Sequence, residues 1–550
     1  MEIENLPNEL LEKIFRHLPV DDLENAALVC LAWKDIILSV IIPKYVTIHL
    51  KPVYPVTHEL IPMPSLLSSQ MMNPFAKSHY KITIPNEELV QSPEFIDFFM
   101  HCGSNLKSLH LQFVQLSEAI LKVFPYLSNL EELCLTTESD ELYGPRPQNP
   151  ELYLSSFKNL KTLKLFHPNY FILHNTSLLS STPLASICFE RFEADLRHLK
   201  PILQQHSSSL RELTVRVEEM KPFLQYLNSL PDLKLCKLNI KSGGNEDDFT
   251  DALIQLFDAQ SQTLRVLRIG SELSLRAVSQ IPKMLPQLQE LELIAESIHD
   301  CKAFAELRHL RKLTMSLYDV RAWDESACIE SVVDFALSVT FPLISPAVFC
   351  SFPNARSFYL EDVDDDTLMR DIIVVQTLMD KVQRVERLDL ENYVLKEREI
   401  LNDSVQRFDT IEGLRMLKYC CRDMSDASLM TMALPELREL HLTHCPRVTF
   451  KGISFLVRSC PLIETLHLEY NKIGFNDDCM DVITRKLTRL RRLYLVNLKG
   501  LTNESVEIIL NNCRNLRELT FSYCIGITMD KAEAIEKLSS LKTLRNLVYS

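Results

Sequence analysis

Glycine is scarce in this chain, with only 10 among 550 residues. This scarcity argues against glycine-rich loops that cradle phosphate groups. An excess of basic charge is also missing, because 59 Lys and Arg stand against 73 Asp and Glu, which gives a net charge of −14. Binding to a nucleic-acid backbone requires a basic protein face. We therefore expect no nucleic-acid partner.

Long apolar runs are missing as well. The most membrane-like stretch runs from Val332 to Cys350, and Asp334, Pro342 and Pro346 interrupt it, so no clean span of about 20 apolar residues remains. The first residues, MEIENLP, are acidic and lack the basic and apolar regions of a secretory signal. We expect no membrane association and a cytoplasmic or nuclear location, where the 15 cysteines would remain reduced.

Known catalytic and metal-binding patterns are absent from the sequence. It contains no HExxH, GxSxG, Walker or CxxC pattern. The acidic run from Glu361 begins like a calcium loop, but Thr367 stands where that loop needs Gly, and Ile373 where it needs Glu. We therefore predict no catalytic residue, no metal site and no cofactor.

What the chain does contain is a repeated pattern, Leu-x-x-Leu-x-Leu. Examples are LKSLHL from Leu106, LRELHL from Leu437 and LRRLYL from Leu490, and LKTLRN from Leu541 resembles a decayed last copy. About 18 copies follow one another at spacings of roughly 22 to 30 residues, the period of leucine-rich repeats. The fourth and sixth residues of each copy point to one face of a short strand.

Between the predicted strands lie helical patterns such as NESVEIILNNC, Asn503 to Cys513. One repeat cannot bury its own apolar face, but stacked repeats share a continuous core. We therefore predict an α/β solenoid (a horseshoe) over residues 46–550, regular from about residue 106, with a parallel inner sheet and outer helices. The proline-rich segments Lys51–Tyr80 and Thr137–Tyr153 are predicted to be loops.

Cysteine or asparagine stands nine positions into several late copies, at Cys445, Asn471 and Cys524. A side chain there can hydrogen-bond the turning backbone of its neighbours. These residues are predicted to be structural, and the pattern resembles the cysteine-containing subclass of leucine-rich repeats.

The third, fifth and seventh residues of each copy point away from the core and form a candidate binding face. In the late copies they combine imidazole, aromatic and charged groups, the types that concentrate binding energy. We predict that this face binds a protein substrate through His441, His467, Glu469, Arg492 and Tyr494. A basic set on three consecutive copies is a candidate phosphate site, and it comprises Arg216, Lys237, Lys241 and Arg268.

The first forty residues differ from the repeats and predict three short helices. Pro7 and Glu9 suit a helix N-terminus, and apolar residues recur from Leu10 to Leu18. A second helix is predicted after an N-cap at Asp21, and a third contains Trp33. Three such helices bury too little apolar surface to be stable alone.

These helices resemble the F-box motif. The shared residues are Leu6-Pro7-x-Glu9-Leu10, Ile14-Phe15-x-x-Leu18, Asp22-Leu23 and Leu28-Val29-Cys30-x-x-Trp33, within residues 5–45. With the repeats behind it, the chain resembles the F-box and leucine-rich-repeat family of substrate receptors. The resemblance implies a domain boundary near residue 45. It also implies adaptor binding through Leu6, Pro7, Leu10, Ile14, Val29, Cys30 and Trp33.

The same resemblance implies a non-catalytic subunit of an SCF-type ubiquitin ligase. Its partners would be the adaptor, through it the cullin and RING subunits, and a protein substrate. Two alternatives share the layout. One is a receptor for a small molecule or an inositol phosphate, similar to plant hormone receptors, and the other is a scaffold without a role in ubiquitylation.

Overall fold

The structure of the chain is a computed structural model. The described residues are 6–18, 23, 26–41, 48–50, 79–84, 92–113, 118–137, 151–152, 157–166, 172–173, 183–190, 196–242, 248–298, 301–320, 323–324, 326–339, 347–362, 385–395, 413–421, 425–445, 447–469, 475–538, 541, 544 and 546–549. The predicted N-cap at Asp21, the structural role of Asn471 and most of the two proline-rich segments lie outside these residues.

The chain forms two compact units. The first comprises Met1–Pro55 and Glu59–Ala252, and the second comprises Val56–His58 and Leu253–Ser550. Within the described part of each unit, the strands pair in parallel, and most of them pair with the next strand along the chain; the exceptions are the pairs β4–β6, β5–β7 and β6–β8. A parallel sheet needs a crossover between consecutive strands, and the helical segment of each repeat supplies it.

In the first unit, a parallel ladder joins β1 to β10, with β5 and β7 paired separately. Its strands are β1 (Ile48–Leu50), β2 (His79–Ile84), β3 (Ser108–Phe113), β4 (Glu132–Thr137), β5 (Glu151–Leu152), β6 (Thr162–Phe166), β7 (Ile172–Leu173), β8 (Ser186–Glu190), β9 (Glu212–Val217) and β10 (Lys237–Ser242). Its repeat helices include α7 (Pro93–Cys102), α8 (Leu196–His206) and α9 (Met220–Ser229).

In the second unit, the ladder runs from β11 to β22 in chain order. Its strands are β11 (Val266–Leu273), β12 (Glu290–Ser297), β13 (Lys312–Asp319), β14 (Asp334–Val339), β15 (Ser357–Asp362), β16 (Arg387–Leu395), β17 (Met416–Cys421), β18 (Glu439–Thr443), β19 (Thr465–Glu469), β20 (Arg492–Val496), β21 (Glu518–Ser522) and β22 (Asn546–Tyr549). The helices include α10 (Thr250–Gln260), at the boundary between the units, α11 (Leu275–Met284), α12 (Ala347–Cys350), α14 (Asp426–Met430), α15 (Phe450–Ser459), α16 (Asp477–Lys486), α17 (Asn503–Asn512) and α18 (Lys531–Leu538).

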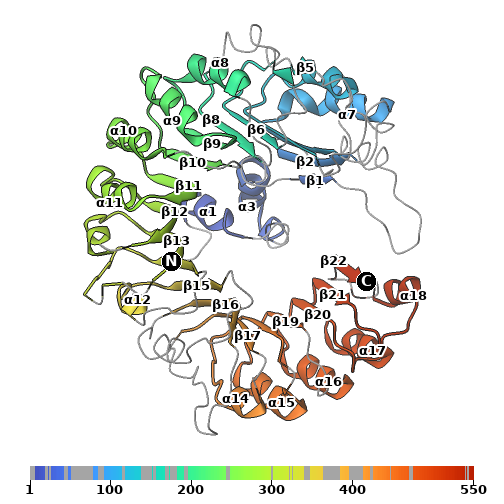
Figure 1. Ribbon diagram of the computed structural model, residues 1–550. Coiled ribbons are helices and arrows are strands. Elements are labelled where there is room, and N and C mark those ends of the chain that lie inside the picture. Colours follow the sequence, from blue (N-terminus) through green and yellow to red (C-terminus); the bar gives the residue numbers. More distant parts are fainter. Residues whose placement is uncertain are drawn as a thin grey trace. The chain divides into compact units, whose positions relative to one another are not determined.

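The repeat pattern accounts for the burial of these strands. In β3, for example, Leu109 and Leu111 are fully buried, whereas Ser108 and His110 on the other face are half-buried. Helices α15, α16 and α17 lie next to one another on one side of strands β18 to β21 (Figure 1). Their buried residues, such as Val506 and Ile509 of α17, complete the core. The α/β repeat solenoid predicted from the sequence is thus confirmed.

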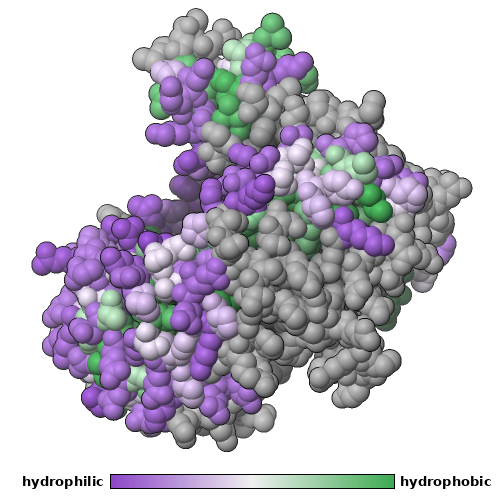
Figure 2. Space-filling model, turned by 90° about the horizontal axis from the view of Figure 1, so that it is seen from above, coloured by the Kyte–Doolittle hydropathy of each residue, from purple (hydrophilic) through white to green (hydrophobic). Residues whose placement is uncertain are grey.

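The described surface agrees with this arrangement. On the face shown in Figure 2, the described side chains are mainly hydrophilic, and hydrophobic ones form only small groups. Among the described residues, no helix is both long enough and apolar enough to cross a membrane.

Two expectations about the limits of the repeats were wrong. Strands begin before residue 106: β1 pairs with β2, and β2 pairs with β3. His79 and Tyr80 therefore belong to a strand and not to a loop. The first of these copies, YVTIHL, contains a single Leu, which hides it from a search for leucines. Thr137 likewise belongs to β4, and Glu151 and Leu152 form β5, so both ends of the second predicted loop lie in strands.

The last copy is shifted by three residues from its predicted position. Asn546 pairs with Glu518, which is the third residue of its own copy. The final copy is therefore LRNLVY, starting at Leu544. Leu541 lies before this copy, and its carbonyl accepts a hydrogen bond from the Leu544 amide at 3.0 Å. Leucines at residues 541 and 544 fit the pattern equally well, and only strand pairing distinguishes them.

The late cysteines are buried against backbone carbonyls. The Cys445 thiol donates to the Thr443 carbonyl at 3.3 Å, and the Cys524 thiol lies 3.5 Å from the Leu495 carbonyl. Burial raises the pKa of the Cys524 thiol above its usual value. A protonated, buried thiol is a poor nucleophile, which indicates a structural role for Cys524. Cys445 is fully buried and bonds a backbone carbonyl, which fits the same role.

Candidate functional site

The N-terminal helices build a small core of their own. Seven buried residues form this core. They come from helix α1 (Asn8–Phe15), helix α3 (Leu31–Ile36), the following π-helical turn (Ile37–Ile41) and the segment between α1 and α3. These residues are Leu11, Phe15, Leu23, Ala26, Ile36, Ile37 and Ile41. The Trp33 ring meets the Phe15 ring edge-on, with 5.0 Å between centroids. This segment therefore closes its core with its own side chains.

Large apolar side chains of the same segment nevertheless remain on the surface. Leu10 and Ile14 lie one turn apart on α1 and are exposed, and so are Leu28, Val29 and Leu31 around the start of α3. Leu28 is the most exposed of them, at 84%. A group of large apolar side chains on the surface is a candidate interaction site, because a partner that covers them removes their apolar surface from water.

The structure separates the seven residues predicted to bind the adaptor into two groups. Pro7, Leu10, Ile14 and Val29 are exposed, and Pro7 is the N-cap of α1 and not its first residue. Leu6 and Trp33 pack against the core, and Cys30 caps α3 by accepting a hydrogen bond from the Trp33 amide at 3.5 Å. Leu6, Cys30 and Trp33 therefore belong to the packing and capping of the helices that carry the exposed residues. Leu28 and Leu31, which stand next to Val29 and Cys30 in the sequence and are also exposed, were not among the seven predicted residues.

A second candidate surface lies on strands β18 to β20 of the second unit. The strand register aligns His441, His467 and Tyr494 in one row across these strands. The two imidazole rings have centroids 5.0 Å apart, and the Tyr494 ring centroid lies 5.7 Å from that of His467. Each member occupies the fifth position of its repeat, so the shared register explains the row. We call these three residues the inner-face row.

Charged and polar partners surround the inner-face row. His441 Nε2 lies 3.1 Å from Glu439 Oε1, and His467 Nε2 lies 3.4 Å from Glu469 Oε2. The Tyr494 hydroxyl donates to Glu518 Oε2 at 2.5 Å.

Arg492 Nε donates to the Thr465 hydroxyl at 2.9 Å. The five residues predicted to contact a substrate thus lie on three adjacent strands, and their partners Thr465 and Glu518 were not among those five. Both could have been predicted from the repeat pattern, because each occupies the third position of its repeat and so points to the same face.

Two groups near the row have shifted pKa values. The hydrogen bond from His441 lowers the pKa of the Glu439 carboxyl, so that side chain stays ionised to lower pH than usual. Burial, together with the hydrogen bond to Glu518, raises the pKa of Tyr494 to about 12. At neutral pH, Tyr494 is therefore an uncharged phenol, and Glu439 is an ionised carboxylate beside the His441 ring.

The basic set predicted as a phosphate site divides between the two units. In the first unit, Arg216 and Lys241 are register partners, and Lys237 pairs with Glu212. Arg216 Nε and Asn239 Oδ1 are buried without a hydrogen-bond partner among the described residues. A buried polar atom without a partner is costly, so a bound ligand could stabilise this part of the sheet.

The fourth member of the set, Arg268, belongs to the second unit. Its Nη2 lies 2.9 Å from Glu290 Oε2, and its Nε lies 3.7 Å from Glu292 Oε2. The charge of Arg268 is therefore matched by carboxylates of the neighbouring strand within its own unit.

Comparison with known proteins agrees with this description. The F-box-like family matches residues 3–42. F-box protein SKIP19 of Arabidopsis thaliana is 26% identical over 131 residues, which cover 24% of this chain and 42% of that protein. F-box/LRR-repeat protein 4 of Bos taurus is 30% identical over 91 residues, which cover 16% of this chain and 15% of that protein. The chain thus spans less than half the length of these relatives. It carries an F-box-like domain at its N-terminus, and the curated proteins that it resembles are F-box and F-box/LRR-repeat proteins.

Proposed function

We propose that this chain is the non-catalytic substrate-recognition subunit of an SCF-type ubiquitin ligase. Residues 1–45 would bind the adaptor, and residues 46–550 would bind the protein to be ubiquitylated. The observation that carries the proposal is the exposed apolar set Leu10, Ile14, Leu28, Val29 and Leu31, which lies on helices whose own core is already closed. The similarity to F-box and F-box/LRR-repeat proteins supports it.

The proposed mechanism is proximity. The adaptor connects this chain to the cullin and RING subunits, which recruit the ubiquitin-carrying enzyme. The repeats hold the substrate near that enzyme and so raise the effective concentration of its lysines. In this proposal the inner-face row and its neighbours, Glu469 and Arg492, contact the substrate, whereas no residue of this chain touches the reacting atoms.

Adaptor binding can be tested with the double variant Pro7→Ala and Leu10→Ala. Loss of this apolar contact should cost about 3 kcal/mol, which weakens adaptor binding roughly a hundredfold. The adaptor subunit is titrated against the full chain, and the dissociation constant is measured by calorimetry.

Leu275→Ala is the matched control, because Leu275 is 42% exposed and Leu10 is 44% exposed. The control should bind the adaptor like the unchanged chain. Unchanged adaptor binding by the double variant would remove the basis of the proposal.

A second candidate function is a receptor for a small anionic ligand on the same layout. The buried and unpartnered Nε of Arg216, beside Lys241, is the observation that favours it. Native mass spectrometry of the purified chain tests this candidate. A phosphate-bearing small molecule that disappears in Arg216→Gln would support it, and an unliganded mass with full adaptor and substrate binding would exclude it.

A further inference from the structure

Two exposed cysteines occupy similar places in consecutive repeats of the second unit. Among the cysteines whose burial the structure describes, Cys328 and Cys350 are exposed, and all others are buried or half-buried. Cys328 lies in the segment before β14, and Cys350 is the last residue of α12, shortly before β15. The two exposed thiols therefore come from neighbouring repeats.

Hydrogen bonds hold the two cysteine segments against each other. The residues that directly follow the two cysteines are Ile329 and Ser351. The Ile329 amide donates to the Ser351 carbonyl at 2.7 Å, and the Trp323 indole Nε1 donates to the Ser351 hydroxyl at 2.9 Å. The chain next to one cysteine is thus in direct contact with the chain next to the other.

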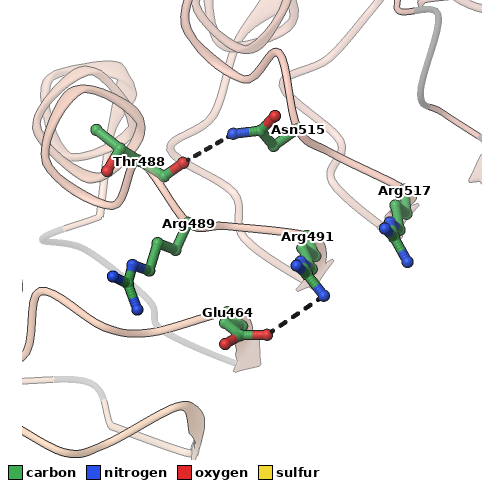
Figure 3. Close-up of a pocket in the computed structure, with 6 residues that line it drawn as sticks. All are labelled: Glu464, Thr488, Arg489, Arg491, Asn515 and Arg517. Carbon is green, nitrogen blue, oxygen red and sulfur yellow. Dashed lines mark hydrogen bonds and ion pairs between the residues drawn. The ribbon is translucent and has the colours of Figure 1, made fainter. Parts of the chain in front are cut away.

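A structural asparagine fastens the same two segments a few residues further along. Asn354 Nδ2 donates to the Glu330 carbonyl at 2.9 Å. In the last repeats Asn515 Nδ2 makes the equivalent bond to the Thr488 carbonyl at 3.1 Å (Figure 3). Because this bond recurs between repeats, the repeat fold itself sets how the two cysteine segments lie against each other.

Buried aromatic rings keep the two segments in place. The Phe352 ring stacks on the Phe335 ring with 4.0 Å between centroids, and the Trp323 ring centroid lies 6.2 Å from that of Phe352. Trp323 precedes Cys328, and Phe352 follows Cys350. Close-packed cores resist displacement, so the two segments cannot separate without opening this contact.

The burial pattern directs both thiols to the surface beside each other. The neighbours on both sides of each cysteine are buried, and they are Ala327, Ile329, Phe349 and Ser351. Each cysteine is therefore an exposed residue between two residues of the shared core. Paired chain segments in a sheet are about 4.8 Å apart, and the Cα atoms of a disulfide are about 4.4–6.8 Å apart. Segments joined by a backbone hydrogen bond thus have a spacing that suits a disulfide.

Buried thiols of the same chain lack this access. Burial raises the pKa of Cys460 to about 11 and the pKa of Cys513 to about 12. Protonated and enclosed thiols react slowly, because the thiolate is the reactive form and the oxidant needs access to it. Oxidation should therefore select the exposed pair.

We propose that Cys328 and Cys350 form a redox-sensitive pair, which hydrogen peroxide converts to a disulfide and a thiol reductant reopens. The sulfur of one thiolate attacks a peroxide oxygen and the O–O bond breaks, which gives a sulfenic acid and a hydroxide that takes up a proton. The sulfur of the other cysteine then attacks the sulfenic sulfur. The S–S bond forms, the S–O bond breaks, and the leaving hydroxide takes the thiol proton. The two sulfurs together lose two electrons, and one peroxide becomes two waters.

The pair does not depend on the role in ubiquitylation. In a reducing compartment it rests as two thiols, and its closure would join the repeat of β14 to the repeat of β15 by a covalent bond. A thiol reductant reverses the closure by thiol–disulfide exchange.

The test treats the purified and fully reduced full chain with hydrogen peroxide. Remaining thiols are blocked with N-ethylmaleimide, the chain is digested without reduction, and cross-linked peptides are identified by mass spectrometry. We expect one internal cross-link, between Cys328 and Cys350, which dithiothreitol removes. Disulfides between copies should be rare, since two neighbouring thiols of one chain have a high effective concentration.

Single variants separate the pair from its surroundings. Cys350→Ser should form no internal cross-link and should accumulate a sulfenic acid at Cys328, which dimedone labels. Cys328→Ser should give the converse result, with the label at Cys350. Cys236→Ser is the matched control, because Cys236 is a half-buried thiol directly before β10, and this variant should keep the cross-link.

Three results would overturn the proposal. Peroxide could oxidise the two thiols without joining them, or could join either of them to a different cysteine or to another copy. The control variant could lose the cross-link. The urea-unfolded chain could give the same cross-link in equal yield, which would show that the fold does not select the pair.

Discussion

At the scale of single residues, the inner-face row makes substrate capture depend on a few side chains. We expect Arg492→Ala with Tyr494→Ala to lower substrate capture while adaptor binding stays unchanged, since Tyr and Arg concentrate binding energy. The two side chains also bond Thr465 and Glu518, so the variant should lose about 1 kcal/mol of stability per bond. Captured proteins are compared by quantitative mass spectrometry with the proteasome blocked.

Arg311→Ala with Tyr318→Ala serves as the control, since it removes the same residue types at other repeat positions. Substrate capture that persists in the Arg492 and Tyr494 variant, and is lost when residues 137–153 are deleted, would place recognition in that proline-rich segment.

The shifted pKa of Glu439 predicts a pH-dependent contribution to stability. His441 lowers this pKa from its usual value of 4.5 in the folded state, so the contribution is present above pH 4.5 and is lost as the pH falls through the folded pKa. Glu439→Gln should therefore lower the urea midpoint of unfolding at pH 6. Below pH 4.5 the urea midpoints of the variant and of the unchanged chain should approach each other. Glu436→Gln, at an exposed residue, should show no such pH-dependent difference.

At the scale of elements, an aspartate in the first turn of one repeat helix hydrogen-bonds the N-cap residue of the following repeat helix. Asp477 of α16 accepts from the Thr502 amide at 3.0 Å and from the Thr502 hydroxyl at 2.7 Å, and Thr502 caps α17. Asp426 holds Thr449, the N-cap of α15, through its two carboxylate oxygens in the same way. In the first pair the Ser505 hydroxyl also donates to Asp477.

The second pair has a glycine where the first has this serine. A Cβ at Gly452 would lie 2.5 Å from Asp426 Oδ1, so a larger residue would displace the carboxylate.

This link predicts a specific loss of stability. Asp477→Ala should destabilise the chain by about 1–2 kcal/mol, because it removes charge-assisted bonds to the N-cap of α17. The matched control is Asp478→Ala, which removes the same charge from the same first helical turn without contacting Thr502. The free energy of unfolding of both variants is measured in urea. If both variants lose the same amount, the effect comes from the helix dipole and not from the bonds to Thr502.

At the scale of the whole molecule, the N-terminal helices and the repeats should be separable. The helix core consists entirely of residues between Leu11 and Ile41. We expect residues 46–550 to keep their secondary structure and their substrate capture, and to lose adaptor binding completely. Circular dichroism and adaptor titration of the truncated chain check this expectation. A truncated chain that unfolds would show that the repeats need the F-box-like helices as a cap.

The sequence by itself determined the local and periodic features of this protein. A leucine period fixes both the strand positions and the buried face, since a strand has a side-chain period of two. It therefore predicted that His441, His467 and Tyr494 share a face, and their common repeat position predicted their row. The N-terminal pattern likewise identified the F-box-like helices, because its apolar residues recur at helical spacing.

Where two positions fit the sequence pattern equally well, only the tertiary structure decided which of them is used. Leu541 and Leu544 fit the pattern equally well, and pairing of Asn546 with Glu518 selects Leu544. The pattern also could not tell which F-box-like residues face outward. Leu28 is exposed while Leu23 is buried, because exposure depends on which helix packs over a residue.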